Sequence, residues 1–161
     1  MPPLKGGDVL LEARSVTAMV MPGVHPVPVI VLELEDGREF ILYHVPLEIV
    51  RAINKLQSSE PGEMGDRESV FELMVDMRDL LSGLGERLEY VVIDEIDPQL
   101  SLYTAKAFFD LGGIGMKRRM IPSHAVFLAL LFGKPIYVSK RLVDMQEEFE
   151  EMMGYGGELE E

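Results

Sequence analysis

The chain has 161 residues, of which 47% are apolar, and its formal net charge is -13. This length and hydrophobicity fit one globular domain with a substantial core and exclude the disordered class. Zero cysteines exclude disulfides and thiol chemistry, and the longest apolar run, residues 125–132, is too short to cross a bilayer. We therefore expect a cytoplasmic protein with no span through a membrane.

The first third of the chain predicts a β-rich region. Residues 1–8 read as a loose lead-in, and the domain is expected to occupy residues 9–153. Val9–Val20 favours β structure without a clean alternation. Val29–Leu34 and Glu39–His44 predict two strands, because an Asp-Gly turn inside residues 35–38 typically closes a β-hairpin.

Two helices are expected next. The first begins near Pro46, a residue that suits the first helical position, and continues to about Leu56. Residues 58–66 predict a polar loop. A second helix over residues 67–82 should end at Gly83 or Gly85. Its inward side chains are predicted at helical spacing: Val70, Phe71, Met74, Met77 and Leu81.

The second half predicts alternating strands and helices. Strands are expected at Tyr90–Ile96 and Leu100–Phe109, followed by a glycine turn and a strand that ends near Met120. An apolar helix at Ser123–Phe132, a strand at Pro135–Val138, a helix at Lys140–Met153 and a mobile acidic tail at residues 154–161 complete the chain. This order predicts a single α+β domain, with a mixed, mainly antiparallel sheet and about four helices.

Charge is unevenly distributed along the chain. From Asp144 onward there are eight acidic residues and no Lys or Arg, which leaves a net charge of -5 for residues 1–143. Residues 111–143 contain no acidic residue and six basic ones: Lys117, Arg118, Arg119, Lys134, Lys140 and Arg141. This segregation marks residues 111–143 as the first place to look for an anion-binding site.

The C-terminal helix carries an apolar stripe with acids on the opposite side. Leu142, Met145, Phe149 and either Met152 or Met153 follow helical spacing. Such a stripe predicts that the helix docks onto the domain or onto a partner.

A motif in the basic region resembles a known family. Residues 119–125 read Arg-Met-Ile-Pro-Ser-His-Ala, followed by an apolar helix and by Pro-Ile-Tyr-Val at residues 135–138. The pattern is similar to Asp-x-Arg-Pro-Ser-Asp-Ala, an apolar helix and Pro-Ile-Tyr/Phe-Val in the bifunctional nuclease domain family. Weaker matches occur in the same order as in that family: residues 29–32 with 36–38, Glu48 with residues 52–53, Arg67 with Leu73, and residues 102–105.

The resemblance implies an α+β domain that self-associates and, in some members, cuts DNA and RNA. It therefore implies nucleic acid as a partner, a homo-oligomer, and a divalent metal ion as the cofactor if the chain hydrolyses phosphodiesters. The chain departs from the family at two motifs. His124 stands where the family has Asp, and Val70-Phe71-Glu72 stands where it has Thr-His-Asp.

Three residues are candidates for catalysis: His124, Glu72 and Glu48. A neutral imidazole at a helix N-terminus could act as a base, although His124 also fits a residue that simply begins a helix after a Ser123 N-cap. Glu72 keeps the acidic character of its motif, but it also fits the exposed face of a helix. Glu48 in a first helical turn interacts favourably with the helix dipole and needs no further role. The sequence assigns no metal ligands.

Lys117, Arg118, Arg119 and Ser123 are candidates for anion binding. A helix N-terminus presents free backbone N–H groups, and the Ser123 hydroxyl could donate beside them. Adjacent residues on a strand point to opposite faces, so Arg118 and Arg119 cannot both line one pocket if the segment is extended. The sequence thus leaves two functions open. One is a diverged nuclease that hydrolyses DNA or RNA, and the other is a non-catalytic oligomeric or anion-binding and nucleic-acid-binding module.

Overall fold

A mixed seven-stranded sheet organises the chain, with strand order β3-β2-β1-β7-β4-β5-β6. The computed structural model describes residues 8–58 and 67–159, the last six of these by their backbone alone. The strands are β1 (Leu10–Met21), β2 (Val27–Leu34), β3 (Glu39–Tyr43), β4 (Leu88–Asp97), β5 (Leu102–Asp110), β6 (Gly115–Met120) and β7 (Ile136–Ser139). The helices are α1 (Leu47–Ser58), α2 (Val70–Asp76), α3 (Ser82–Arg87), α4 (Pro122–Phe132) and α5 (Lys140–Leu159), with a 3₁₀ turn η1 (Arg78–Leu81). The predicted α+β class is confirmed.

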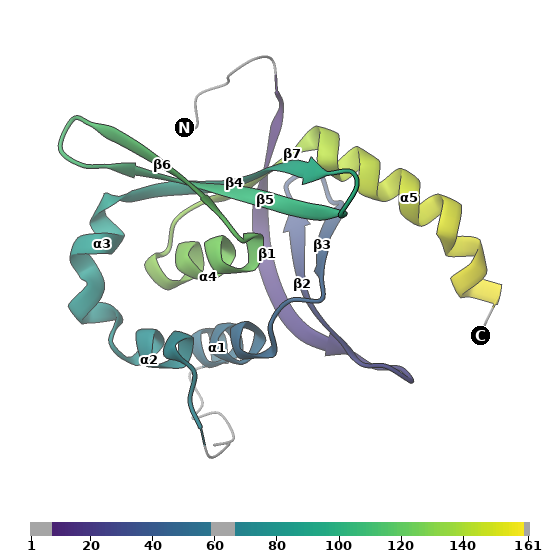
Figure 1. Cartoon of the computed structure of the whole chain (residues 1–161), viewed down its shortest axis with the longest axis horizontal. Helices are drawn as coiled ribbons and strands as arrows, with labels where there is room; N and C mark the ends of the chain where they lie inside the picture. Colours follow the sequence, from purple (N-terminus) through teal and green to yellow (C-terminus); the bar gives the residue numbers. More distant parts are fainter. Residues whose placement is uncertain (1–7, 59–66, 160–161) are drawn as a thin grey trace.

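The sheet is mainly antiparallel, and β4 with β7 forms its parallel pair. Strand β1 joins the two halves, because residues 10–12 pair with β7 whereas residues 13–21 pair with β2. A shift in register between Ala13 and Ser15 accompanies this change of partner. In Figure 1 the half formed by β1–β3 runs steeply across the half formed by β4–β6, and α4 lies in the corner between them.

The predicted hairpin is confirmed as β2 and β3. Gly37 has a φ of 90°, a left-handed conformation that glycine adopts without steric cost. Leu34 and Arg38 close the turn through a 2.8 Å hydrogen bond in which the Leu34 N–H donates to the Arg38 carbonyl. Asp36 accepts from the Arg38 N–H at 3.0 Å, which further fixes the turn.

Helices α1–α4 cover one side of the sheet, and α5 lies on the other side (Figure 1). Helix α4 packs at the centre, where Ala125, Val126, Phe127 and Ala129 are all buried. This position explains why its sequence is apolar on every side. Gly133 ends α4 in a left-handed conformation with a φ of 65°, and its N–H reaches the last carbonyls of the helix.

The helix expected over residues 67–82 is wrong in its extent. The chain forms the short helix α2, the 3₁₀ turn η1 and then α3, so Gly83 and Gly85 lie inside a helix instead of ending one. Gly85 is required there by packing, because a Cβ on it would lie 2.4 Å from the Phe132 ring. The break changes the buried face: Val70 and Met77 are exposed, whereas Glu72 and Val75 are buried.

The C-terminal helix is longer than the predicted Lys140–Met153. Helix α5 extends to Leu159, so the backbone of residues 154–159 continues the helix where a separate tail was expected. Residues 1–7 of the lead-in, residues 59–66 of the polar loop and residues 160–161 lie outside the described residues. Within the described ranges, no helix combines the length and hydrophobicity needed to span a membrane.

Candidate functional site

Strand β6 holds the predicted basic cluster at one edge of the sheet. Its register with β5 pairs Lys117 with Phe108, Arg118 with Ala107, and Arg119 with Lys106. Because side chains alternate along a strand, Lys117 and Arg119 share one face and Arg118 lies on the other, with the buried Ala107. Arg118 and Arg119 therefore do not line one pocket.

Arg119 and Lys106 bind two carboxylates on the outer face. The Arg119 Nη1 lies 2.8 Å from Glu95 Oε1, and the Lys106 Nζ lies 2.7 Å from the same oxygen and 2.9 Å from Asp94. Hydrogen bonds from Lys106 and then from Arg119 lower the pKa of Glu95 from its ordinary value. The negative charge of Asp94 and Glu95 is thus compensated, and Lys117 has no ion pair with any described residue.

Aromatic rings continue this outer face from Lys117 toward the middle of the sheet. Phe108 and Tyr90 are stacked with centroids 4.6 Å apart, and Tyr137 meets Tyr90 edge-on at 5.8 Å. All three rings are half-buried, and burial raises the pKa of Tyr90 and of Tyr137. They belong to the side of the sheet that faces away from the core, because the intervening Val91 and Ala107 belong to the core. Such a surface can stack bases while a flanking cation contacts phosphate.

Ser123 does not join Lys117 at the surface. The N-cap of α4 is Ile121, with Pro122 at the first helical position, so the prediction that Ser123 caps the helix is wrong. The helix starts one residue earlier than expected, which turns Ser123 toward the core. Its side chain is buried, and its Oγ has no hydrogen-bond partner.

His124 lies in the first turn of α4, beside α2. Its ring is half-buried and meets Phe71 edge-on, with centroids 5.1 Å apart. Phe71 also packs edge-on against Phe127 at 5.5 Å. His124 is therefore held by the same aromatic contact that joins α2 to α4.

Glu72 caps α2, and its interpretation as an exposed residue is wrong. Its Oε1 accepts from the Ser69 N–H at 3.3 Å, and its own N–H donates to Ser69 Oγ at 3.2 Å. These reciprocal bonds form a capping box, which holds the Glu72 side chain at the N-terminus of α2. In this position Glu72 is only 8% exposed. Arg51 on α1 lies 3.8 Å from its other carboxylate oxygen.

Glu48 lies exposed in the first turn of α1, as expected for a residue that meets the helix dipole. Among the described residues, no hydrogen bond or ion pair joins any two of His124, Glu72 and Glu48. The same part of the chain contains no group of three or more His, Asp or Glu side chains placed to hold a metal ion.

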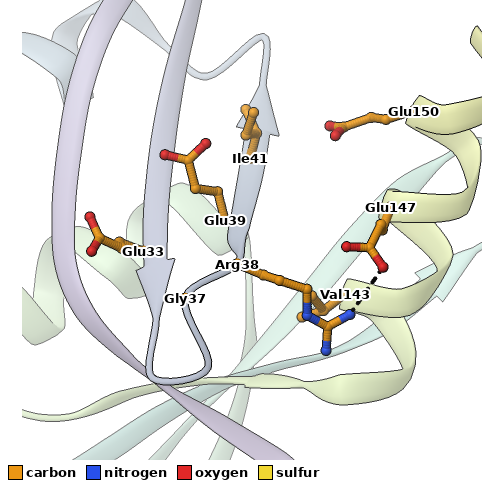
Figure 2. Close-up of a pocket in the computed structure, with 8 residues that line it drawn as sticks. All are labelled: Glu33, Gly37, Arg38, Glu39, Ile41, Val143, Glu147 and Glu150. Atoms are coloured by element: carbon orange, nitrogen blue, oxygen red, sulfur yellow. Dashed lines mark hydrogen bonds and ion pairs between the residues drawn. The ribbon is translucent and has the colours of Figure 1, made fainter. Parts of the chain in front are cut away.

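A groove that the sequence did not predict lies between the β2–β3 hairpin and α5. It has a volume of about 460 Å³, and its lining residues are Glu33, Gly37, Arg38, Glu39, Ile41, Val143, Glu147 and Glu150. Figure 2 shows the carboxylates of Glu33 and Glu39 on the hairpin and those of Glu147 and Glu150 on the facing helix. The signal in the sequence was the placement of Glu33 and Glu39 three residues on either side of Asp36 in a predicted hairpin.

Arg38 neutralises this groove only in part, because its guanidinium is shared between Glu147 in the lining and two further carboxylates, Asp36 and Asp144. The guanidinium lies 2.9 Å from Asp36, 2.7 Å from Asp144 and 3.5 Å from Glu147. Hydrogen bonds to Asp144 and then to Asp36 raise the pKa of Arg38 above its ordinary value. The groove therefore keeps a negative charge, at the opposite edge of the sheet from β6.

No protein-family model matches the sequence, and no curated protein matches it.

Proposed function

We propose that the protein binds single-stranded nucleic acid on the outer face of β4, β5 and β6. The observation that carries the proposal is the register of β6, which places Lys117 directly opposite Phe108 in its stacked pair with Tyr90. Phosphate is contacted by Lys117, and bases stack on the ring surface. This proposal corresponds to the non-catalytic alternative left open by the sequence.

Electrostatics supports this location over the rest of the surface. Two carboxylates of β4 on this face, Asp94 and Glu95, are already bound by Lys106 and Arg119. The acidic groove lies toward the opposite edge of the sheet, where it repels a polyanion. With a net charge of -13 and Lys117 as the named phosphate contact, the protein should bind weakly, and its affinity should fall modestly as the salt concentration rises.

Fluorescence anisotropy with labelled oligo-uridine and oligo-thymidine, over a series of salt concentrations, tests the proposal. Lys117→Ala should weaken binding and reduce the slope of log K against log salt by about one, since one phosphate contact is lost. Phe108→Leu keeps an apolar side chain but removes the stacked ring, and it should weaken binding about tenfold or more. The matched control is Arg78→Ala, which removes an exposed arginine from η1. Equal weakening by Arg78→Ala, or unchanged binding by Lys117→Ala, would contradict the proposal.

Hydrolysis of DNA or RNA is the second candidate function. One contact favours it: Phe71 packs on His124, so the helices that carry Glu72 and His124 are neighbours. A divalent metal ion would be the cofactor, as the resemblance implies. Self-association and a cytoplasmic location likewise remain predictions.

Cleavage assays with Mg²⁺, Mn²⁺ or EDTA separate the two candidates. Glu72→Gln is the informative variant, because glutamine can also complete a capping box and preserves the fold of α2. Metal-dependent cleavage that is lost in both Glu72→Gln and His124→Asn would establish the nuclease. If the wild-type protein binds nucleic acid but does not cleave it, the nuclease function is rejected and the binding function is retained.

A further inference from the structure

Helix α5 is packed at its start and unpartnered further along. Leu142, Val143 and Gln146 are buried against the sheet. Phe149 is 63% exposed and Met153 is 60% exposed, although helical spacing places both on the same face as Leu142 and Gln146. In Figure 1 the later turns of α5 project beyond β3, so this face continues past the surface that covers its first turns.

The exposed face is larger than two side chains. Met145 and Met152 flank Phe149 on the helix, and they are 43% and 80% exposed. Exposed apolar residues that form a contiguous set on one helix face typically mark an interaction site, whereas single exposed ones are ordinary. Methionine adapts its shape easily, which suits a surface that accepts another chain.

The groove beside this exposed face of α5 is negatively charged. Glu147 and Glu150 of α5 face the hairpin, and Glu33 and Glu39 lie opposite each other in the register of β2 and β3. Like charges directly opposite on neighbouring strands destabilise a sheet. Neither Glu33 nor Glu39 has an ion pair with any described residue, and within the described chain the one side-chain hydrogen bond to the pair is the 3.5 Å bond from Ser15 Oγ to Glu33, so no described cation offsets this repulsion. A cationic side chain in the groove would offset it.

We propose that this surface, formed by the exposed face of α5 and the acidic groove, docks a basic amphipathic segment of a partner protein. The apolar side chains of the segment pack on Phe149 and Met153, and its Lys or Arg side chains enter the groove between Glu39 and Glu150. The surface lies toward the edge of the sheet opposite to β6, so the inference is independent of nucleic-acid binding.

Charge selects this occupant over a second copy of the chain. A second copy would bring another net charge of -13, and two such chains repel each other. From Asp144 to the C-terminus the chain has eight acidic residues and no basic one. A segment rich in Lys and Arg is electrostatically complementary to this region.

The test uses a labelled synthetic peptide of leucine and lysine with helical amphipathic spacing, and two comparison peptides. One replaces every lysine with glutamate, and the other has the same composition in an order without an apolar face. The leucine–lysine peptide should bind at low salt, and both comparison peptides should bind much more weakly. Phe149→Ala should weaken binding about tenfold, because a large apolar contact is lost. The matched control is Leu80→Ala, at an exposed leucine of η1, which should leave affinity unchanged.

Glu39→Gln separates binding from folding. It removes one partner of the Glu33–Glu39 pair, so it should raise thermal stability while it weakens peptide binding about threefold. Glu86→Gln, at an exposed glutamate of α3, is its control and should alter neither property. A variant that is more stable and yet binds less cannot owe its weak binding to unfolding.

Several results would overturn the proposal. The first is equal binding of the leucine–glutamate peptide, and the second is equal weakening by Leu80→Ala and Phe149→Ala. Absence of binding by the wild-type protein at low salt would also reject it. Light scattering tests whether a second copy of the chain occupies this surface instead. A wild-type dimer that dissociates in Phe149→Ala would assign the surface to a second copy and overturn the proposal.

Discussion

The Gln146 side chain on α5 forms two hydrogen bonds, each 2.8 Å long, with the backbone of Ile41 on β3. The Ile41 N–H donates to Gln146 Oε1, and the Gln146 Nε2 donates to the Ile41 carbonyl. Strand β3 is an edge of the sheet, and Gln146 therefore occupies the place that a further strand would take. An edge covered in this way is protected from pairing with another chain.

Gln146→Leu should lower the free energy of unfolding by about 1–2 kcal/mol, because both backbone groups of Ile41 lose their partner. Urea denaturation measures this change. Hydrogen exchange at the Ile41 amide gives a local readout, and it should accelerate in the variant. If exchange at Ile41 were unchanged, the amide would not depend on Gln146.

Two glycines of α3 should respond to alanine in opposite ways. Gly83→Ala should raise the free energy of unfolding by about 0.5–1 kcal/mol, since a Cβ at Gly83 would meet no atom within 4 Å and alanine favours a helix. Gly85→Ala should lower it by about 1–3 kcal/mol, because its Cβ would lie 2.4 Å from the Phe132 ring. Thermal and urea denaturation of the two variants measure both changes in stability. A Gly85→Ala protein as stable as Gly83→Ala would show that Phe132 moves without cost.

Two buried serines offer a second matched pair. Ser123→Ala should raise the free energy of unfolding by about 1 kcal/mol, because its buried Oγ has no hydrogen-bond partner. Ser139→Ala should lower it by about 1–2 kcal/mol, since the buried Ser139 Oγ donates to Asp8 at 2.7 Å. Chemical denaturation measures whether each substitution raises or lowers the free energy of unfolding. Destabilisation by both substitutions would indicate that Ser123 has a partner in solution.

Glu95 should make stability depend on pH in the acid range. Its pKa is lowered from 4.5 in the folded protein by Lys106 and then by Arg119, so the carboxylate stabilises the fold above its unfolded pKa. That contribution is lost as the pH falls through the lower, folded pKa. The wild-type protein should therefore exceed Glu95→Gln in free energy of unfolding at neutral pH, and the difference should shrink below about pH 4.5. Urea denaturation across this range measures the difference, and a gap independent of pH would contradict the assignment.

The sequence predicted those elements whose signals are local. The hairpin from β2 to β3 follows from Asp36-Gly37, because the turn needs a residue that tolerates a positive φ. Helix α4 was predicted within one residue, because the continuous apolar run at residues 125–132, with Pro122 before it and Gly133 after it, has few other solutions. The opposite orientation of Arg118 and Arg119 followed from strand alternation alone.

The candidate sites were predicted less completely, since they depend on contacts between distant residues. Glu72 matched an exposed position by helical spacing, but the break after α2 and the capping box with Ser69 bury it. The aromatic surface beside Lys117 needs β4, β5 and β7 side by side, which no local pattern specifies. The acidic groove likewise requires α5 to lie against the hairpin, more than 100 residues away in the chain.

The sequence by itself determined the α+β class, the order of the strands along the chain, and the separation of basic residues 111–143 from the acidic C-terminal region. These properties depend on periodicity, turn chemistry and composition, which act over a few residues at a time. Only the tertiary structure decided that the basic strand and the acidic groove lie at opposite edges of one sheet. It also decided that α5 leaves Phe149 exposed after burying Leu142, because the sheet ends before the helix does.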